Sequence, residues 1–202
     1  MTDGLTPDGL TPDGLTVVKL GGSHALSPLL RPWLTAIGRA AGHVVVVPGG
    51  GPFADAVRSA QRAVGFDDEA AHDMAMMAMA QYGRALTSLT DGFVYADTLA
   101  TVRDAASSRK IPIWSPWPGL RAHPDIPRSW DVTSDSLAAW LASALNARRL
   151  VLIKHRASAG DDLLDAAFPR FAERFHGAID IAGPDDLASA DALFATHSPA
   201  GA

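Results

Sequence analysis

The sequence predicts an α/β protein built on a mainly parallel β-sheet with helices on both faces. Short β-branched runs alternate with Ala- and Leu-rich segments of helical length, a pattern typical of crossover units that pair parallel strands. The chain has 202 residues, of which 48% are apolar and 19% are charged. A chain of this size and composition can bury a full core as one domain, and wholesale disorder is disfavoured.

Six apolar runs bounded by turn signals predict the strands. In chain order they read Val-Val-Lys-Leu, four valines, Phe-Val-Tyr, Ile-Pro-Ile-Trp, Leu-Val-Leu-Ile and Ala-Ile-Asp-Ile, and the last is the weakest. We therefore expect strands at 17–20, 44–47, 93–95, 111–114, 150–153 and 178–181. Ligands of such sheets bind beyond the carboxyl ends of the strands, so chemistry is expected just after each strand.

The segments between the strands predict the helices. We expect them at 29–41, 53–64, 67–89, 97–108, 135–147, 163–175 and 185–195. Pro52 suits the first position of the second helix. The third helix carries four methionines on more than one face, which favours packing in the core or at a dimer surface.

The beginning of the chain has a different character. Residues 2–16 repeat a pentapeptide, Thr/Pro-Asp-Gly-Leu-Thr, with no apolar period that fits a helix or strand. We therefore expect residues 1–15 to form a disordered tail that folding does not need, and residues 16–202 to form a single domain.

Composition excludes several functional classes. The absence of cysteine rules out disulfides, thiolate metal sites and a cysteine nucleophile. A formal net charge of −5 disfavours general binding to nucleic acid or to an anionic membrane. The first residues lack a basic start and an apolar run, so we expect a cytoplasmic protein.

Two glycine-rich loops follow the first two strands. Lys19 ends the first strand and precedes Gly21, Gly22 and Ser23, whose amides can point at phosphate oxygens beside the lysine charge. A simple turn with a solvent-facing lysine is an equal alternative. The second strand ends in Gly49, Gly50 and Gly51 before a helix, an arrangement that makes a cradle for a phosphate or carboxylate.

A third polar cluster precedes the predicted helix 135–147. It contains Asp131, Thr133, Ser134, Asp135 and Ser136. Ser134 or Asp135 is a natural N-cap, and all of these side chains could serve capping. One helix start needs one cap, however, so Asp131 and Asp135 could also hold a metal or orient lysines.

Together, the two glycine loops and the Thr133–Ser136 segment resemble the amino acid kinase superfamily, over residues 16–154. That resemblance implies a three-layer α/β/α sandwich and an ATP- and Mg²⁺-dependent small-molecule kinase. Its acceptor would carry a phosphate or a carboxylate.

The resemblance also implies roles for these residues. Lys19, Gly21, Gly22 and Ser23 would contact the transferred phosphoryl group and its donor. The three glycines of the second loop would cradle the acceptor, together with Asp131, Thr133 and Ser134. Asp135 would orient a catalytic lysine rather than act as a base.

Residues 71–83 and 130–142 resemble one short branch of that superfamily, associated with the biosynthesis of one-carbon carriers. The archaeal member of this branch phosphorylates an aminomethylfuran-methyl phosphate on the way to methanofuran. The resemblance also implies a homodimer, which the methionine-rich helix 67–89 independently favours.

The chain departs from the superfamily pattern near its end. The acidic loop after the fifth strand is replaced by Lys154, His155 and Arg156, and a later Gly-Gly-Met motif with its lysine is absent. The nucleotide-binding part would thus be shortened. Either Lys154 replaces the missing lysine, or the protein is a catalytically degenerate partner or regulator in the same pathway. An unrelated dinucleotide-binding fold is disfavoured, because no Gly-x-Gly-x-x-Gly occurs.

Other residues leave alternatives open. Asp68 and His72 lie four apart and could share a metal, but no third ligand is near, so we expect no protein metal site. His24 follows the first glycine loop and could donate to a phosphate, although capping is commoner. Trp114, Trp117 and Trp130 flank a Pro-rich loop and either wall an aromatic acceptor pocket or anchor the core.

Overall fold

The structure is a computed structural model, and it describes residues 14–155 and 163–194. Its centre is a single six-stranded sheet in the order β3-β4-β2-β1-β5-β6. Neighbouring strands of this sheet pair in parallel. The strands are β1 (Thr16–Leu20), β2 (Val44–Pro48), β3 (Phe93–Ala96), β4 (Ile111–Trp114), β5 (Arg149–Ile153) and β6 (Ala178–Ala182). All six predicted strands are confirmed, with bounds within one residue.

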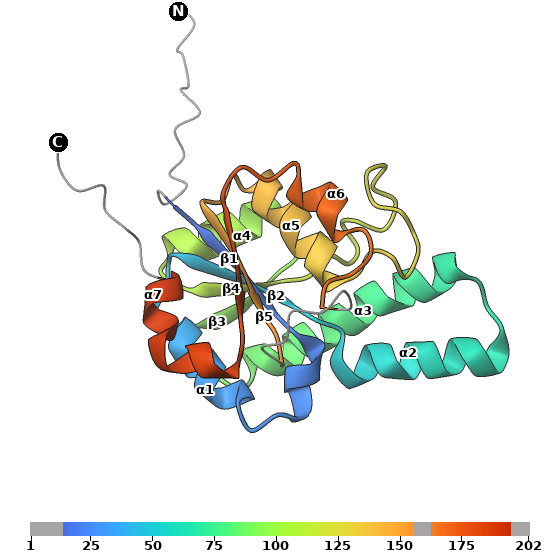
Figure 1. The fold of residues 1–202 in the computed structure, drawn as a ribbon, viewed down its shortest axis with the longest axis horizontal. Helices are drawn as coiled ribbons and strands as arrows, with labels where there is room; N and C mark the ends of the chain where they lie inside the picture. Colours follow the sequence, from blue (N-terminus) through green and yellow to red (C-terminus); the bar gives the residue numbers. More distant parts are fainter. Residues whose placement is uncertain (1–13, 156–162, 195–202) are drawn as a thin grey trace, which may run out of the picture.

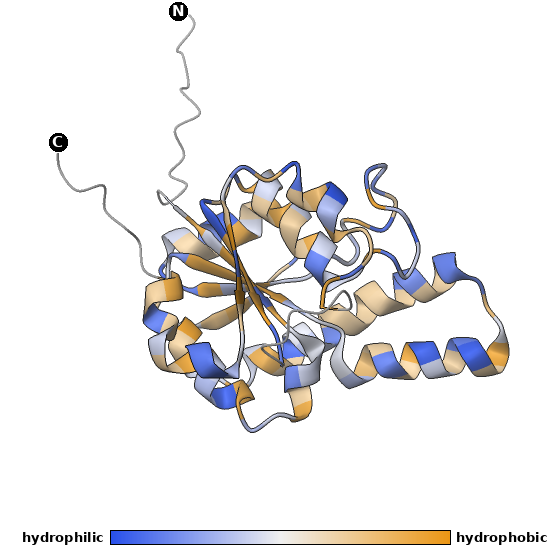
Figure 2. Cartoon of the chain, in the orientation of Figure 1, coloured by the Kyte–Doolittle hydropathy of each residue, from blue (hydrophilic) through white to orange (hydrophobic). Residues whose placement is uncertain are grey.

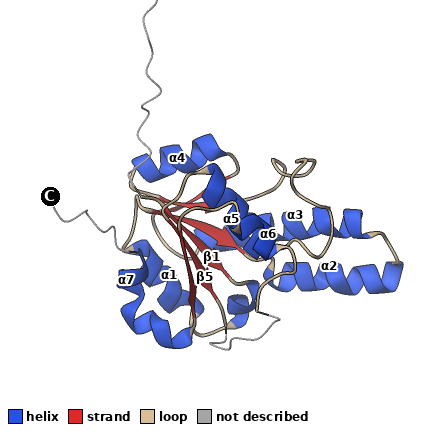
Figure 3. Ribbon diagram, turned by 45° about the horizontal axis from the view of Figure 1, so that its top comes forward, coloured by secondary structure: helices blue, strands red, loops and turns tan. Residues whose placement is uncertain are grey.

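Helices cover both faces of the sheet, so the predicted three-layer α/β/α sandwich is confirmed (Figures 1 and 3). The α-helices are α1 (Leu30–Gly38), α2 (Gly51–Val64), α3 (Asp68–Thr87), α4 (Leu99–Ser107), α5 (Ser134–Ala144), α6 (Phe168–Ala172) and α7 (Ala190–Phe194). Two 3₁₀ helices are η1 (Gly22–Leu26) and η2 (Pro184–Ser189). The helix predicted at 163–175 was too long, because its first residues form turns. The one predicted at 185–195 is η2 followed by α7.

The core has two halves, one on each face of the sheet. Alternation along β1 sends Val17 toward α5 and α6, and sends Val18 and Leu20 toward α1 and α7. The strands are accordingly the most hydrophobic part of the chain (Figure 2). Lys19 shares the face of Val17, so β1 directs its one charged side chain toward the start of α5.

The helices α2 and α3 form an antiparallel pair that projects beyond the carboxyl ends of the strands (Figures 1 and 3). Gly65 ends α2 with a left-handed φ of 85°, which favours glycine, and Asp67 caps α3 by accepting from the amide of Ala70 at 2.8 Å. This projection forms one wall above the edge of the sheet where ligands bind in such folds.

The connection from β4 to α5, residues 115–133, folds back over α3. Asp73 of α3 is buried and accepts from Arg128 Nη2 at 2.7 Å and from Arg121 Nε at 3.1 Å. Arg128 also pairs with Glu69. These ion pairs fix the connection against the α2–α3 pair and complete the wall.

The predicted tail, residues 1–15, mostly lies outside the described residues. Its last residue, Leu15, is 2% exposed and belongs to the core, and its carbonyl accepts from the amide of Arg148 at 3.0 Å. The folded part therefore includes Leu15, one residue before the predicted boundary.

Among the described residues, no helix combines the length and the hydrophobicity needed to cross a membrane.

Candidate active site

Three loops meet at the carboxyl ends of β1, β2 and β5. The amide of Gly21 donates to the carbonyl of Ile153 at 3.2 Å, and the amide of Gly49 donates to the carbonyl of Leu20 at 2.9 Å. A cavity of about 580 Å³ opens above this junction. It lies where the sheet topology predicts ligand binding.

The two glycine loops pack directly on each other. A Cβ atom on Gly49 would collide with the backbone of Gly22, and one on Gly22 would collide with the backbone of Gly51. These positions therefore require glycine for the close approach of two backbones, as well as for any ligand. Because α2 begins at Gly51 with no side-chain capping bond and Gly50 and Gly51 line the cavity, the start of this helix is available to a ligand.

Two lysines and one aspartate form a buried cluster at the base of the cavity. Lys19 Nζ lies 2.8 Å from Asp135 Oδ1, and Lys154 Nζ lies 2.7 Å from Asp135 Oδ2. The exposed fractions of Lys19, Asp135 and Lys154 are 6%, 4% and 8%. The alternative of a solvent-facing lysine is therefore wrong, because Lys19 is buried in its contact with Asp135 at the start of α5. The two ammonium groups and one carboxylate leave a net positive charge facing the cavity.

The pKa values of Asp135 and Lys154 reflect the contact of one carboxylate with two ammonium groups. Burial alone would raise the pKa of Asp135, but the adjacent charges of Lys19 and Lys154 outweigh it and hold that pKa below its usual range. Burial, together with the charge of Lys19, lowers the pKa of Lys154 to about 8, although Asp135 opposes the shift. The carboxylate is thus ionised at neutral pH and keeps two cations in fixed positions.

The start of α5 holds Asp135 in place. The N-cap is Thr133 and not Ser134 or Asp135 as predicted, and the Thr133 side chain makes no capping bond within the helix. The carboxylate of Asp165 takes that role, accepting from the amides of Thr133 and Ser136 at 2.9 and 3.0 Å and from both hydroxyls. Asp135 is left free for the lysines because a distant residue caps its helix.

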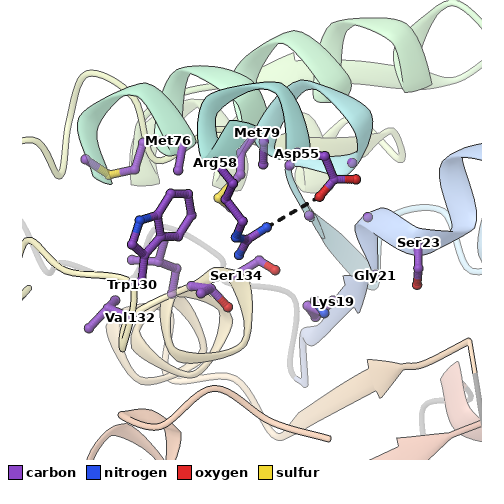
Figure 4. Close-up of a pocket in the computed structure, with 18 of the residues that line it drawn as sticks. Lys19, Gly21, Ser23, Asp55, Arg58, Met76, Met79, Trp130, Val132 and Ser134 are labelled. Atoms are coloured by element: carbon purple, nitrogen blue, oxygen red, sulfur yellow. Dashed lines mark ion pairs between the residues drawn. The ribbon is translucent and has the colours of Figure 1, made fainter. Parts of the chain in front are cut away.

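The outer wall of the cavity comes from α2, α3 and the 115–133 connection (Figure 4). Trp130 is fixed by its indole N–H, which donates to Gln61 Oε1 at 2.7 Å. The guanidinium of Arg58 lies 4.2 Å from the centre of the Trp130 ring and 3.5 Å from Asp55. Apolar side chains fill the rest of this wall: Ala54, Ala75, Met76, Met79, Val132 and Leu137.

The predicted site residues are mostly brought together. The cavity is lined by Lys19, Gly21, Gly22, Ser23, Gly49, Gly50, Gly51, Thr133, Ser134, Lys154 and His155. Thr133 commits its hydroxyl to Asp165, and Asp131 is exposed and is not among the lining residues. Arg156 lies outside the described residues.

The other candidates divide between core and cavity. Trp130 lines the cavity, whereas Trp114 is 3% exposed and stacks on Trp140 in the core. His24 is fully buried beneath the first glycine loop, and burial with the nearby charge of His155 lowers its pKa. In residues 14–155 and 163–194, no group of three or more His, Asp or Glu side chains could hold a metal ion.

Sequence reasoning missed Arg58, Gln61 and Asp165. Arg58 and Gln61 read as ordinary polar residues of an exposed helix face. Asp165 lay inside a predicted helix, and nothing local distinguishes it as the cap of a segment about 30 positions earlier.

Comparison with known proteins agrees with this geometry. A model of the amino acid kinase family matches residues 14–156. Over 139 residues the chain is 30% identical to the (5-(aminomethyl)furan-3-yl)methyl phosphate kinase of Methanocaldococcus jannaschii, covering 67% of this chain and 63% of that protein. The match thus spans less than two thirds of the relative's length.

Two solved structures share the fold. The uridylate kinase of Archaeoglobus fulgidus superposes with a TM-score of 0.65 at 16% identity, over 87% of this chain and 95% of that one. The UMP kinase of Ureaplasma parvum gives a TM-score of 0.66 at 15% identity, over 88% and 96%. The sheet order, the paired glycine loops and the family match over residues 14–156 lead to one conclusion: the chain belongs to the amino acid kinase family.

Proposed function

We propose that this protein is a kinase that transfers the γ-phosphoryl group of ATP to a small phosphate ester. The acceptor we propose is (5-(aminomethyl)furan-3-yl)methyl phosphate or a close relative of it, the substrate named for the Methanocaldococcus jannaschii protein. One observation carries the proposal: Asp135 holds two lysine ammonium groups at the base of a cavity framed by two glycine loops.

The cluster suits phosphoryl transfer, whose transition state spreads negative charge over oxygens and needs positioning more than covalent chemistry. An oxygen of the acceptor phosphate attacks the γ-phosphorus. The bond from that phosphorus to its bridging oxygen breaks, ADP leaves, and the acceptor becomes a diphosphate ester. Lys19 and Lys154 balance the charge that develops, and no protein side chain acts as the nucleophile.

The same residues fit a nucleotide with its Mg²⁺ ion. Two lysines, the amides of the first glycine loop and the open start of α2 are all phosphate ligands. Asp55 is a carboxylate on the same cavity wall and would contribute to holding the ion, alongside the phosphates themselves. When bound, Mg²⁺ supplies further neutralisation of the β- and γ-phosphates.

The cavity wall supports a flat, partly apolar acceptor. Trp130, Met76 and Met79 offer the aromatic and thioether surfaces on which a small ring packs. The second glycine loop connects β2 to α2 and lines the same cavity, which suits the phosphate of the acceptor.

A ³¹P NMR assay tests the proposal. With MgATP and (5-(aminomethyl)furan-3-yl)methyl phosphate, the spectrum should gain the two coupled resonances of a diphosphate ester while ATP becomes ADP. A reaction without acceptor is the control. Calorimetric titration with ATP, with and without Mg²⁺, runs in parallel. Binding of MgATP without transfer to any acceptor would favour the alternative, a catalytically degenerate partner or regulatory protein. We favour the kinase because both lysines of the cluster are present and contact Asp135.

We also propose a cytoplasmic homodimer. Met74 and Met77 of α3 are 37% and 36% exposed, one turn apart, on the side of the helix away from the buried Met76 and Met79. Such a pair is suited to burial against a second copy. Light scattering at micromolar concentration should give the mass of a dimer, and the monomer mass there would contradict the proposal.

A further inference from the structure

His72 is a buried residue in the cavity wall that the proposed reaction leaves without a role. It lies on α3, is 2% exposed, and forms part of the cavity lining. Its Nδ1 atom lies 3.0 Å from the carbonyl oxygen of Ser129. Because a carbonyl can only accept, Nδ1 carries the proton, and Nε2 of the neutral ring presents a lone pair.

That lone pair has no hydrogen-bond partner among the described residues. A buried polar atom without a partner costs about 1–3 kcal/mol and calls for an explanation. The ring remains neutral near pH 7, because burial lowers the pKa of His72 although Ser129 and Asp73 oppose the shift. A neutral ring in this tautomer can accept a hydrogen bond at Nε2 and cannot donate one there.

His72 lies toward the end of the cavity away from the lysines. Figure 4 shows Met76 and Trp130 on one side of the cavity, and Lys19 and Gly21 on the other. His72 precedes Met76 by one helical turn and bonds to the residue next to Trp130. From His72 to Met79 the helix rises about 10 Å, roughly the length of a small substituted ring.

The neighbouring aromatic face already holds a cation. The Arg58 guanidinium lies 4.2 Å from the Trp130 ring centre, on a side chain that is 43% exposed and has a 3.5 Å ion pair with Asp55. Such a flexible, weakly held side chain can move aside and leave the ring face to another cation. The Nε2 atom of His72 is covered in the structure, so a ligand group reaches it only when side chains of the cavity wall move.

We infer that His72 is a specificity-determining residue for the acceptor. Its Nε2 atom accepts a hydrogen bond from an N–H or O–H group at the end of the acceptor remote from the phosphate, beside the face of Trp130. A primary ammonium satisfies both partners, since it donates to His72 and rests its charge on the ring. The inference rests on the proposed function for one point, that the acceptor phosphate lies at the glycine loops.

Two ligands and two variants test the inference. The ligands are (5-(aminomethyl)furan-3-yl)methyl phosphate and its 5-ethyl analogue, in which a methyl group replaces the amine. The variants are His72→Gln, whose amide oxygen can replace Nε2, and His72→Asn, whose amide nitrogen can replace the Nδ1 donor to Ser129. Calorimetry measures the affinity of each ligand for each protein, and thermal unfolding reports structural damage.

The parent should prefer the amine by about 10-fold or more, as expected when a buried acceptor is otherwise left unpaired. His72→Gln should keep most of this preference. His72→Asn should reduce it to less than about 3-fold while still holding the 5-ethyl ligand. The inference is overturned if the parent shows no preference, if His72→Asn keeps it, or if both variants lose both ligands together with their thermal stability.

The ³¹P assay, run on the same proteins, separates this inference from the proposed kinase function. Preference for the amine without phosphoryl transfer would reject the kinase and keep the role of His72. Transfer to both ligands at equal affinity would keep the kinase and reject the role of His72.

Discussion

The two ends of the cavity are built in different ways. At the phosphate end, Lys19 is part of β1 and Lys154 follows β5 directly, so parallel pairing in the centre of the sheet sets their separation. At the acceptor end, Trp130 and His72 come from a long connection and a projecting helix, held together by side-chain contacts such as Gln61–Trp130 and Asp73–Arg128. The first end depends on backbone register and the second on individual side chains.

This difference has a physical consequence. Removing Asp135 at the phosphate end leaves buried charges unpaired, which is costly. At the acceptor end the groups that would lose a partner, Arg121 and Arg128, are themselves partly exposed, so the cost is smaller. We therefore expect a substitution that leaves buried charges unpaired at the phosphate end, such as one of Asp135, to affect folding and transfer together. Substitutions at the acceptor end should affect substrate affinity alone.

The largest expected effect on stability belongs to Asp135→Asn. The change leaves two buried ammonium groups facing each other without the carboxylate between them. Removing one partner from a buried ion-paired cluster costs about 3–5 kcal/mol, so the free energy of unfolding in urea should fall by that amount. A loss below 1 kcal/mol would show that the cluster behaves like a surface pair.

Asp73→Asn should affect the acceptor end alone. It removes the carboxylate shared by Arg121 and Arg128, and Arg128 keeps only its contact with Glu69, so the 115–133 connection is held less firmly on α3 and Trp130 is less well positioned. The KM for the acceptor should rise roughly 10-fold, while the affinity for MgATP stays at the parent value. Asp104→Asn, an exposed charge removed from α4, is the matched control. An equal loss of MgATP affinity would contradict the independence of the two ends.

The pH profile tests the charge of Lys154. With its pKa lowered to about 8, this lysine loses its proton as the pH rises through that value, and the neutral amine no longer attracts phosphate. The kcat/KM for MgATP should therefore fall above about pH 8. In Lys154→Arg the guanidinium stays charged, so the descending limb should move to higher pH. A profile identical in both proteins would assign the limb to another group.

The smallest expected effect belongs to Arg39→Met. This substitution removes one positive charge, as the loss of a lysine from the buried cluster would, but from an exposed ion pair. Arg39 lies 2.8 Å from Asp191, with exposed fractions of 53% and 70%. Such surface pairs contribute about 0–1 kcal/mol. Stability and transfer rate should both stay close to the parent values, which separates the effect of the buried cluster from a simple change in net charge.

The same division explains what could be predicted from the sequence. The strands could be predicted because β-branched runs between turn residues have few other interpretations. Their ends place Lys19 and Lys154 at the ligand-binding edge of the sheet, whereas the pairing of β1 with β5 is seen only in the structure. The sequence also identified Asp135, but left open whether it caps a helix or orients a lysine. The structure shows the contact with both lysines because Asp165 supplies the cap.

The acceptor end could not be predicted in the same way. The indole of Trp130 meets Gln61 across 69 positions, and Asp73 meets Arg128 across 55, so neither contact leaves a periodic signal. His72 attracted notice only as a possible metal partner of Asp68. In the structure Asp68 and His72 have different partners: Asp68 accepts a hydrogen bond from Gln61 at 2.8 Å, and His72 donates one to the carbonyl of Ser129.

The central claim is that Lys19, held by Asp135, stabilises the transferred phosphoryl group. The most direct test is the single-turnover rate constant of Lys19→Met at saturating MgATP and acceptor, where methionine keeps the buried stem and removes the charge. The account predicts a rate about 10²-fold or more below the parent, on the order of 3 kcal/mol, in a protein that still folds and binds both substrates. A folded Lys19→Met protein that transfers at the parent rate would contradict it.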